Sequence, residues 1–181
     1  MPPLRLTISA SVGRKYTRFL KSKLIAAHEL IAPPLCEFSV ALIGNEKMSS
    51  LHEEFLSDDS PTDVLTFELE HDDEGRVVAG EVVICVPVAI KQARERGTAI
   101  EQELLLYALH GMLHLCGYND KTSAAYTTMH AREDEILIAL GMGPVFANGS
   151  SPQARSASKS LAKVPREPSR AHTGVGKCSS I

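Results

Sequence analysis

The sequence is organised around residues 109–120, which read Leu109-His110-Gly111-Met112-Leu113-His114-Leu115-Cys116-Gly117-Tyr118-Asn119-Asp120. His110 and His114 are four residues apart, so on a helix both imidazoles lie on one face, one turn apart. Residues 104–115 are almost all apolar, which predicts a buried helix. Gly117 readily ends a helix in a left-handed turn. We therefore expect the chain to reverse there and to bring Asp120 back towards the histidines.

This pattern predicts a metal site. Two histidines and a carboxylate leave one position open on a tetrahedral Zn²⁺, which is the catalytic rather than the structural arrangement. We predict one Zn²⁺ per chain, held by His110, His114 and Asp120. The alternative is that the two histidines only pack and form hydrogen bonds, as buried imidazoles must. His130 is a reserve third ligand, and Glu81 is a candidate for orienting a ligand histidine. The sequence does not identify a general base, so the catalytic residues stay open.

Four segments together are similar to one known family. They are His-Gly-x-Leu-His-Leu-x-Gly-Tyr at 110–118, Ser-Pro-Thr-Asp-Val-Leu-Thr-Phe at 60–67, Gly-Glu-Val-Val-Ile-Cys at 80–85, and the segment 129–141. In their order along the chain they resemble the YbeY family of bacterial endoribonucleases, over about residues 4–143. The resemblance implies a zinc-dependent enzyme of ribosomal RNA maturation. It also implies a mixed sheet, mostly parallel with one antiparallel strand.

The chain departs from the family pattern at two places. The family usually has Asp-His after Gly-Tyr, and that His is the third metal ligand, whereas this chain has Asn119-Asp120. Asp is a competent Zn²⁺ ligand, but its charge makes a bound water less acidic and shifts the preference towards harder ions such as Mn²⁺. The family also usually has an aromatic-Arg pair where this chain has Phe55-Leu56. Because Leu cannot neutralise a phosphate, we expect another cation to replace that Arg, or the activity to be weakened or altered.

The resemblance implies a metal-dependent, single-strand-specific endoribonuclease of ribosome biogenesis. Its substrate would be precursor ribosomal RNA, and the small ribosomal subunit is a further candidate partner. A non-catalytic ribosome assembly factor with a structural metal is one alternative, favoured by Leu56. A metallopeptidase is the other, since HxxxHxxGxxD is close to the peptidase pattern HExxHxxGxxH/D. The peptidase needs a Glu directly after the first His as general base, and this chain has Gly111 there.

Hydrophobic periodicity predicts alternating strands and helices. The expected strands are 4–10, 36–43, 64–70 and 81–86. The expected helices are 14–31, 45–55, 87–96, 99–116 and a last helix that ends at 140. Together with the resemblance, these elements predict a single α+β domain with a mixed four-stranded sheet and about five helices. The metal site is expected on a central helix and in the turn after it.

Charge divides the chain into two parts. Residues 148–181 contain six basic residues and one acid, a net charge of +5, and since the whole chain carries −3, residues 1–147 carry −8. The 148–181 segment is rich in Ser, Pro and Ala and has few large apolar residues. Such a composition predicts a disordered basic tail after a folded domain at 1–147. The tail could attract RNA non-specifically, although a solvated tail without a partner is an equal alternative. The acidic domain itself does not indicate nucleic-acid binding.

Localisation follows from what the sequence lacks. No apolar run approaches the roughly 20 residues that span a bilayer, so no membrane partner is expected. The beginning, Met-Pro-Pro-Leu-Arg at 1–5, has no apolar core of a secretory signal. The four cysteines, at 36, 85, 116 and 178, have no CxxC spacing, which argues against a disulfide framework or a cysteine metal site. We therefore expect a cytoplasmic protein.

Overall fold

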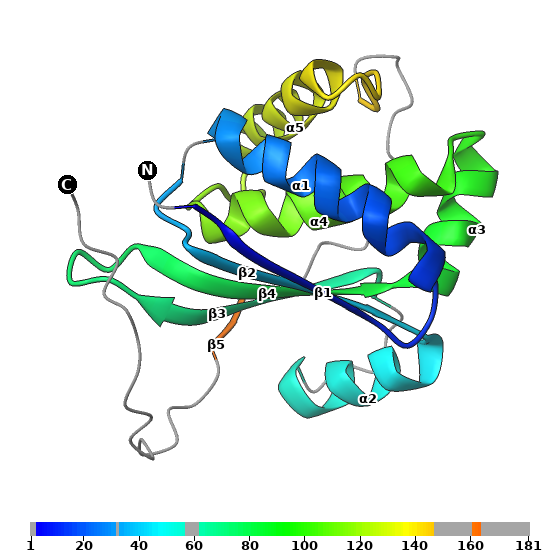
Figure 1. Ribbon diagram of the computed structural model, residues 1–181, viewed down its shortest axis with the longest axis horizontal. Coiled ribbons are helices and arrows are strands. Elements are labelled where there is room, and N and C mark those ends of the chain that lie inside the picture. Colours follow the sequence, from blue (N-terminus) through cyan, green and yellow to red (C-terminus); the bar gives the residue numbers. More distant parts are fainter. Residues whose placement is uncertain (1–2, 32, 57–61, 147–160, 164–181) are drawn as a thin grey trace.

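The strands form one mixed sheet in the order β1-β2-β4-β3-β5. The computed structural model describes residues 3–31, 33–56, 62–146 and 161–163 (Figure 1). The strands are β1 (Arg5–Ala10), β2 (Glu37–Ile43), β3 (Val64–His71), β4 (Val77–Cys85) and β5 (Leu161–Lys163). β1, β2 and β4 are parallel neighbours, β3 is antiparallel to β4, and β5 is parallel to β3. The four predicted strands and the mixed sheet are confirmed.

The fifth strand differs from the sequence prediction. Leu161–Lys163 was expected to belong to a disordered tail, but Leu161 pairs with Thr66 and Lys163 with Glu68. The physical reason is that the outer edge of β3 presents backbone N–H and C=O groups, to which a short segment can bind without a hydrophobic core of its own. The remainder of 148–181 lies outside the described residues.

In the residues that the structure describes, five α-helices surround the sheet, as predicted. They are α1 (Thr17–Ile31), which follows the 3₁₀ turn η1 (Arg14–Tyr16), α2 (Asn45–Leu56), α3 (Val86–Arg96), α4 (Ile100–Leu115) and α5 (Ser123–Ala139). α4 packs on β3 and β4, α1 packs on β1 and α4, and α5 lies outside against α4. α2 lies on the opposite side of the sheet (Figure 1). In the described part of the chain, no helix is both long enough and apolar enough to cross a bilayer.

α4 is the central helix of the fold. Every residue from Glu103 to Leu115 is buried, because the helix is enclosed by the sheet and by the outer helices. Two glycines allow it to approach the sheet closely. A Cβ atom added to Gly80 would lie 2.5 Å from Leu115 Cδ1, and one added to Gly111 would lie 2.3 Å from Val82 Cγ2. The position of α4, and of the histidines on it, thus depends on small residues at these crossings.

β4 begins earlier than predicted. The sequence indicated a strand from 81. The strand instead begins at Val77 and passes through Gly80, which pairs with Phe38 of β2. The residue is a glycine because the side chain of Leu115 occupies the place that a Cβ would need.

Candidate metal centre

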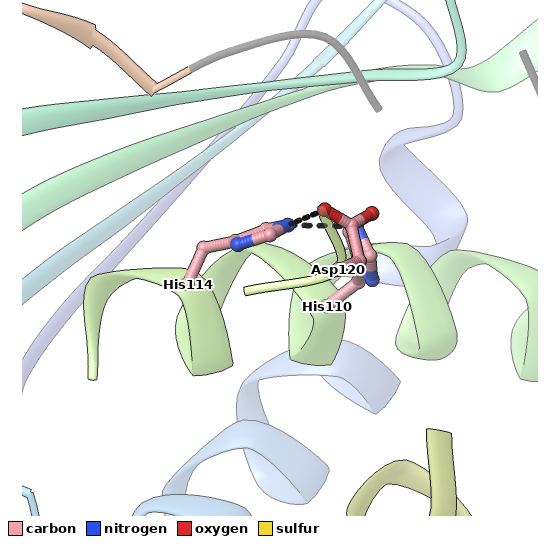
Figure 2. A group of neighbouring side chains, drawn as sticks. All are labelled: His110, His114 and Asp120. Atoms are coloured by element: carbon pink, nitrogen blue, oxygen red, sulfur yellow. Dashed lines mark hydrogen bonds and ion pairs between the residues drawn. The ribbon is translucent and has the colours of Figure 1, made fainter. Parts of the chain in front are cut away.

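The two histidines and Asp120 meet at the C-terminal end of α4. His110 and His114 project from the same face of the helix (Figure 2). After Leu115 the chain turns through Gly117, whose φ is 90°, and returns Asp120 towards the two rings. The ligand atoms of the three residues all lie within 4.8 Å of one another. The predicted helix, its end and the chain reversal are therefore present.

The distances between these side chains favour one metal ion bound by all three residues. Nε2 of His110 and Nε2 of His114 are 3.1 Å apart. Each of these nitrogens lies 4.0 Å from one carboxylate oxygen of Asp120. Two nitrogen ligands of a tetrahedral Zn²⁺ are separated by about 3.3 Å, given Zn–N bonds of about 2.0–2.1 Å. The separation of the two imidazole nitrogens thus fits a bound zinc ion.

The hydrogen-bond partners assign the tautomers of both rings. Nδ1 of His114 lies 3.0 Å from the carbonyl oxygen of Tyr118, which can only accept, so this nitrogen carries a proton. Nδ1 of His110 lies 2.8 Å from the carboxylate oxygen Oε1 of Glu133 and is its donor. A neutral imidazole has one N–H, so Nε2 of each ring presents a bare lone pair. Two lone pairs at 3.1 Å repel each other unless a cation or a proton lies between them.

The electrostatic environment keeps His114 neutral. Burial, and then the neighbouring His110 ring, lower the pKa of His114 below its ordinary value of 6.5. The two rings are only 3% and 9% exposed, for His110 and His114 respectively, so water does little to screen them. A metal ligand must be the unprotonated imidazole. The surroundings therefore favour the form that binds metal.

Glu133 of α5 contacts the candidate metal centre, although the sequence pattern did not indicate it as a site residue. Its side chain is fully buried, and its second oxygen, Oε2, lies 2.5 Å from Nδ1 of His130. Burial by itself would raise the pKa of the Glu133 carboxyl, but hydrogen bonds from His110 and His130 outweigh it and lower the pKa to about 2. The available signal was a His-x-x-Glu spacing on the last helix. Periodicity alone does not show that this face of α5 meets His110.

Two alternatives from the sequence are wrong. Among the described residues, His130 is not part of the group whose ligand atoms gather at His110 and His114, and its Nδ1 bonds to Glu133. Glu81 does not orient a ligand histidine. Side chains alternate along β4, so Gly80 and Val82 face α4 while Glu81 faces the other side of the sheet. There Glu81 lines a pocket with residues of α2, including Lys47.

The packing around Gly111 leaves no space for the general base of the metallopeptidase pattern. A Cβ at this position would lie 2.3 Å from Val82 Cγ2 and 2.8 Å from Thr66 Oγ1. Val82 and Thr66 are cross-strand partners of β4 and β3, so the sheet itself fills this space. A Glu beside His110, which the metallopeptidase pattern requires, has no room here.

Comparison with known proteins shows which family this sequence matches. The family model described as Endoribonuclease YbeY matches residues 8–141. The chain belongs to the YbeY endoribonuclease family. Endoribonuclease YbeY of Geobacillus thermodenitrificans is 36% identical over 119 residues, which are 61% of this chain and 76% of that protein. Endoribonuclease YbeY of Bacillus thuringiensis is 36% identical over 116 residues, or 59% and 74% of the two chains.

A solved structure has a similar fold. The solution structure of a protein from Thermotoga maritima is 30% identical in sequence and superposes with a TM-score of 0.53. The match covers 83% of this chain and 99% of that chain.

Of the two departures from the YbeY pattern, Asp120 lies at the cluster with both histidines. Leu56 is the last residue of α2, and its side chain lies outside the described part of the chain.

Proposed function

We propose that this YbeY family member is a metal-dependent endoribonuclease that cleaves single-stranded segments of precursor ribosomal RNA. His110, His114 and Asp120 would hold one divalent ion, Zn²⁺ or a harder ion such as Mn²⁺. The observation that carries the proposal is the pair of bare Nε2 atoms 3.1 Å apart, beside a carboxylate. Membership of a family whose model is described as an endoribonuclease supports the reaction class.

The ligand set suits an anionic substrate. When bound, a divalent ion polarises a phosphoryl oxygen and acidifies a water molecule, which are the two requirements of phosphodiester hydrolysis. Two neutral imidazoles and one carboxylate neutralise only one of the ion's two charges. The remaining charge would lie on the ion itself, where a phosphoryl oxygen could bind directly. A ribosomal RNA substrate is consistent with the predicted cytoplasmic location, and the small ribosomal subunit is the proposed partner.

A non-catalytic assembly factor with a structural metal is the second candidate. Leu56 favours it, since the family's Arg is expected to contact phosphate or the reacting centre. The two candidates share the metal and differ in whether RNA is cut. A peptidase is disfavoured by the lack of space at Gly111.

The test has two stages. Metal content is first measured by mass spectrometry on protein purified without an affinity tag. The proteins compared are the wild type, the His110→Ala/His114→Ala double variant and the control His71→Ala. His71 is an exposed histidine outside the cluster. About one metal ion per chain is expected in the wild type and in His71→Ala, and none in the double variant. The same proteins are then incubated with single-stranded and duplex RNA. Metal-dependent cutting of the single strand supports the proposal, bound metal without cutting indicates the assembly factor, and no metal in the wild type rejects both.

A further inference from the structure

A buried triad of His110, Glu133 and His130 links α5 to the candidate metal centre. Oε1 of Glu133 lies 2.8 Å from Nδ1 of His110, and Oε2 lies 2.5 Å from Nδ1 of His130. Each oxygen of one carboxylate is thus occupied by a different imidazole. The terminal torsion of a Glu side chain is broad and weakly restricted by itself. With both oxygens bonded, the carboxylate cannot rotate without losing both hydrogen bonds.

From this geometry we infer that Glu133 and His130 are positioning residues of the metal centre. His130 holds the Glu133 carboxylate, and Glu133 fixes the His110 ring with its proton on Nδ1 and its Nε2 lone pair facing His114 and Asp120. The inference rests on the proposed function, because it assigns these residues a role towards the metal. Neither residue touches the substrate or the ion, and both act through His110.

The charges of the triad support a role beyond packing. Glu133 has two imidazoles as hydrogen-bond partners and no Arg or Lys within ion-pair distance in the described part of the chain. Glu103, the other fully buried carboxylate of the helical layer, is paired with Arg96 at 3.0 Å. A buried carboxylate without a cation is unfavourable. A divalent ion at His110, His114 and Asp120 would offset the charges of Asp120 and Glu133 together.

The burial of His130 is unfavourable in one respect, and its hydrogen bond to Glu133 explains why a histidine is nevertheless present. Its ring lies between Tyr126 and Phe146, with centroid distances of 3.9 Å to each. Nε2 of His130 is buried and has no hydrogen-bond partner among the described residues. A Phe side chain at position 130 would pack between the same two rings without leaving a polar atom unpaired. The Nδ1–H bond to Glu133 is the contact that such a side chain would lose.

The experiment compares two matched pairs of variants. Glu133→Gln keeps the shape of the side chain and removes its charge, and Glu103→Gln does the same to a buried carboxylate away from the centre. His130→Phe keeps the stacking with Tyr126 and Phe146, and His28→Phe replaces a buried histidine that bonds a backbone carbonyl instead. Zinc affinity is measured by competition with a chromophoric chelator. Histidine tautomers are measured by ¹⁵N NMR on the metal-free proteins, which does not depend on RNA cleavage.

We expect Glu133→Gln to weaken zinc binding about 10–100-fold, and His130→Phe about tenfold, while both controls stay close to the wild type. In metal-free wild type, His110 should be the Nδ1–H tautomer, and in Glu133→Gln the Nε2–H tautomer should appear, because the new amide can donate to Nδ1. Wild-type zinc affinity in folded Glu133→Gln would overturn the inference, and so would an equal loss in Glu103→Gln.

Two further outcomes separate this inference from the proposed function. If the wild type binds no metal, the proposed function fails and the role of Glu133 towards a metal fails with it, while an Nδ1–H tautomer of His110 would show only that Glu133 orients this ring. If the wild type binds zinc and its metal-free His110 is mainly the Nε2–H tautomer, the positioning inference fails and the proposed function stands. Should Glu133→Gln not fold, the wild-type tautomer spectrum and the zinc affinity of His130→Phe still decide the question.

Discussion

Gly111 of α4 lies so close to Val82 of β4 that a Cβ atom added to the glycine would be 2.3 Å from Val82 Cγ2. This contact fixes how deeply α4 sits on the sheet. Gly111 directly follows His110, so the same contact sets the height of the candidate ligands above the strands. The absence of a side chain at 111 is therefore a requirement of packing. It also removes the position at which a metallopeptidase would carry its general base.

Replacing this glycine should destabilise the protein. Gly111→Ala places a methyl group against Val82 and against Thr66 Oγ1, at 2.8 Å, so the helix must move away from the sheet. Overpacking of this kind typically lowers the free energy of unfolding by about 1–3 kcal/mol. Urea denaturation measures the change. Gly44→Ala is the control, because its nearest contact would be an ordinary 3.5 Å from Val12 Cγ2. Equal stabilities of the two variants would show that α4 has room at this position.

The third ligand can be tested by substitution in two directions. Asp120→Ala removes the carboxylate that lies 4.0 Å from each Nε2, and should lower zinc affinity at least about tenfold. Asp120→His restores the residue usual in the YbeY family and should bind zinc at least as tightly as the wild type, with a weaker preference for Mn²⁺. Competition with a chromophoric chelator measures both ions. Unchanged zinc stoichiometry and affinity in both variants would mean that Asp120 is not a ligand.

Stability of the metal-free protein should fall in mild acid. The pKa of His114 is lowered by burial and by His110, so in the unfolded chain this ring takes up a proton near its ordinary value of 6.5, and in the folded chain only at lower pH. Below 6.5 the unfolded state binds more protons and is favoured, which means that the stability is complete above 6.5 and is lost as the pH falls.

Urea denaturation at about pH 7.5 and about pH 5.5 with a chelator present should therefore show a lower midpoint at the acidic pH. His114→Asn removes the titrating ring and should reduce this difference. His71→Asn controls for the loss of a histidine as such, since His71 is exposed at the end of β3. A pH dependence in His114→Asn as large as that of the wild type would contradict the prediction.

Cys116 should be a poor nucleophile, although it directly follows α4, the helix that carries His110 and His114. Burial raises the pKa of its thiol to about 12, so the reactive thiolate is scarce near neutral pH. Native protein treated with iodoacetamide at about pH 8 should remain unmodified at Cys116 by mass spectrometry, and modification should follow unfolding in urea. Rapid labelling of the folded protein would show that the thiol is activated.

The sequence by itself determined the elements and which side chains meet at the candidate centre. The i, i+4 spacing of His110 and His114 fixes both rings on one helical face, and Gly117 permits the reversal that returns Asp120. These are short-range properties of the chain, which local geometry controls. For the same reason the four main strands and five helices were predicted, whereas the start of β4 was missed where Gly80 meets Leu115 across the fold.

Only the tertiary structure decided which distant residues support the centre. Glu133 is 23 residues from His110 and becomes its partner because α5 packs on α4. The sequence suggested Glu81 for orienting a ligand histidine, but the alternation of β4 turns it to the opposite face of the sheet. The pairing of Leu161–Lys163 with β3 likewise depends on which strand edge is open. Periodicity specifies which residues share a face, and packing specifies what that face meets.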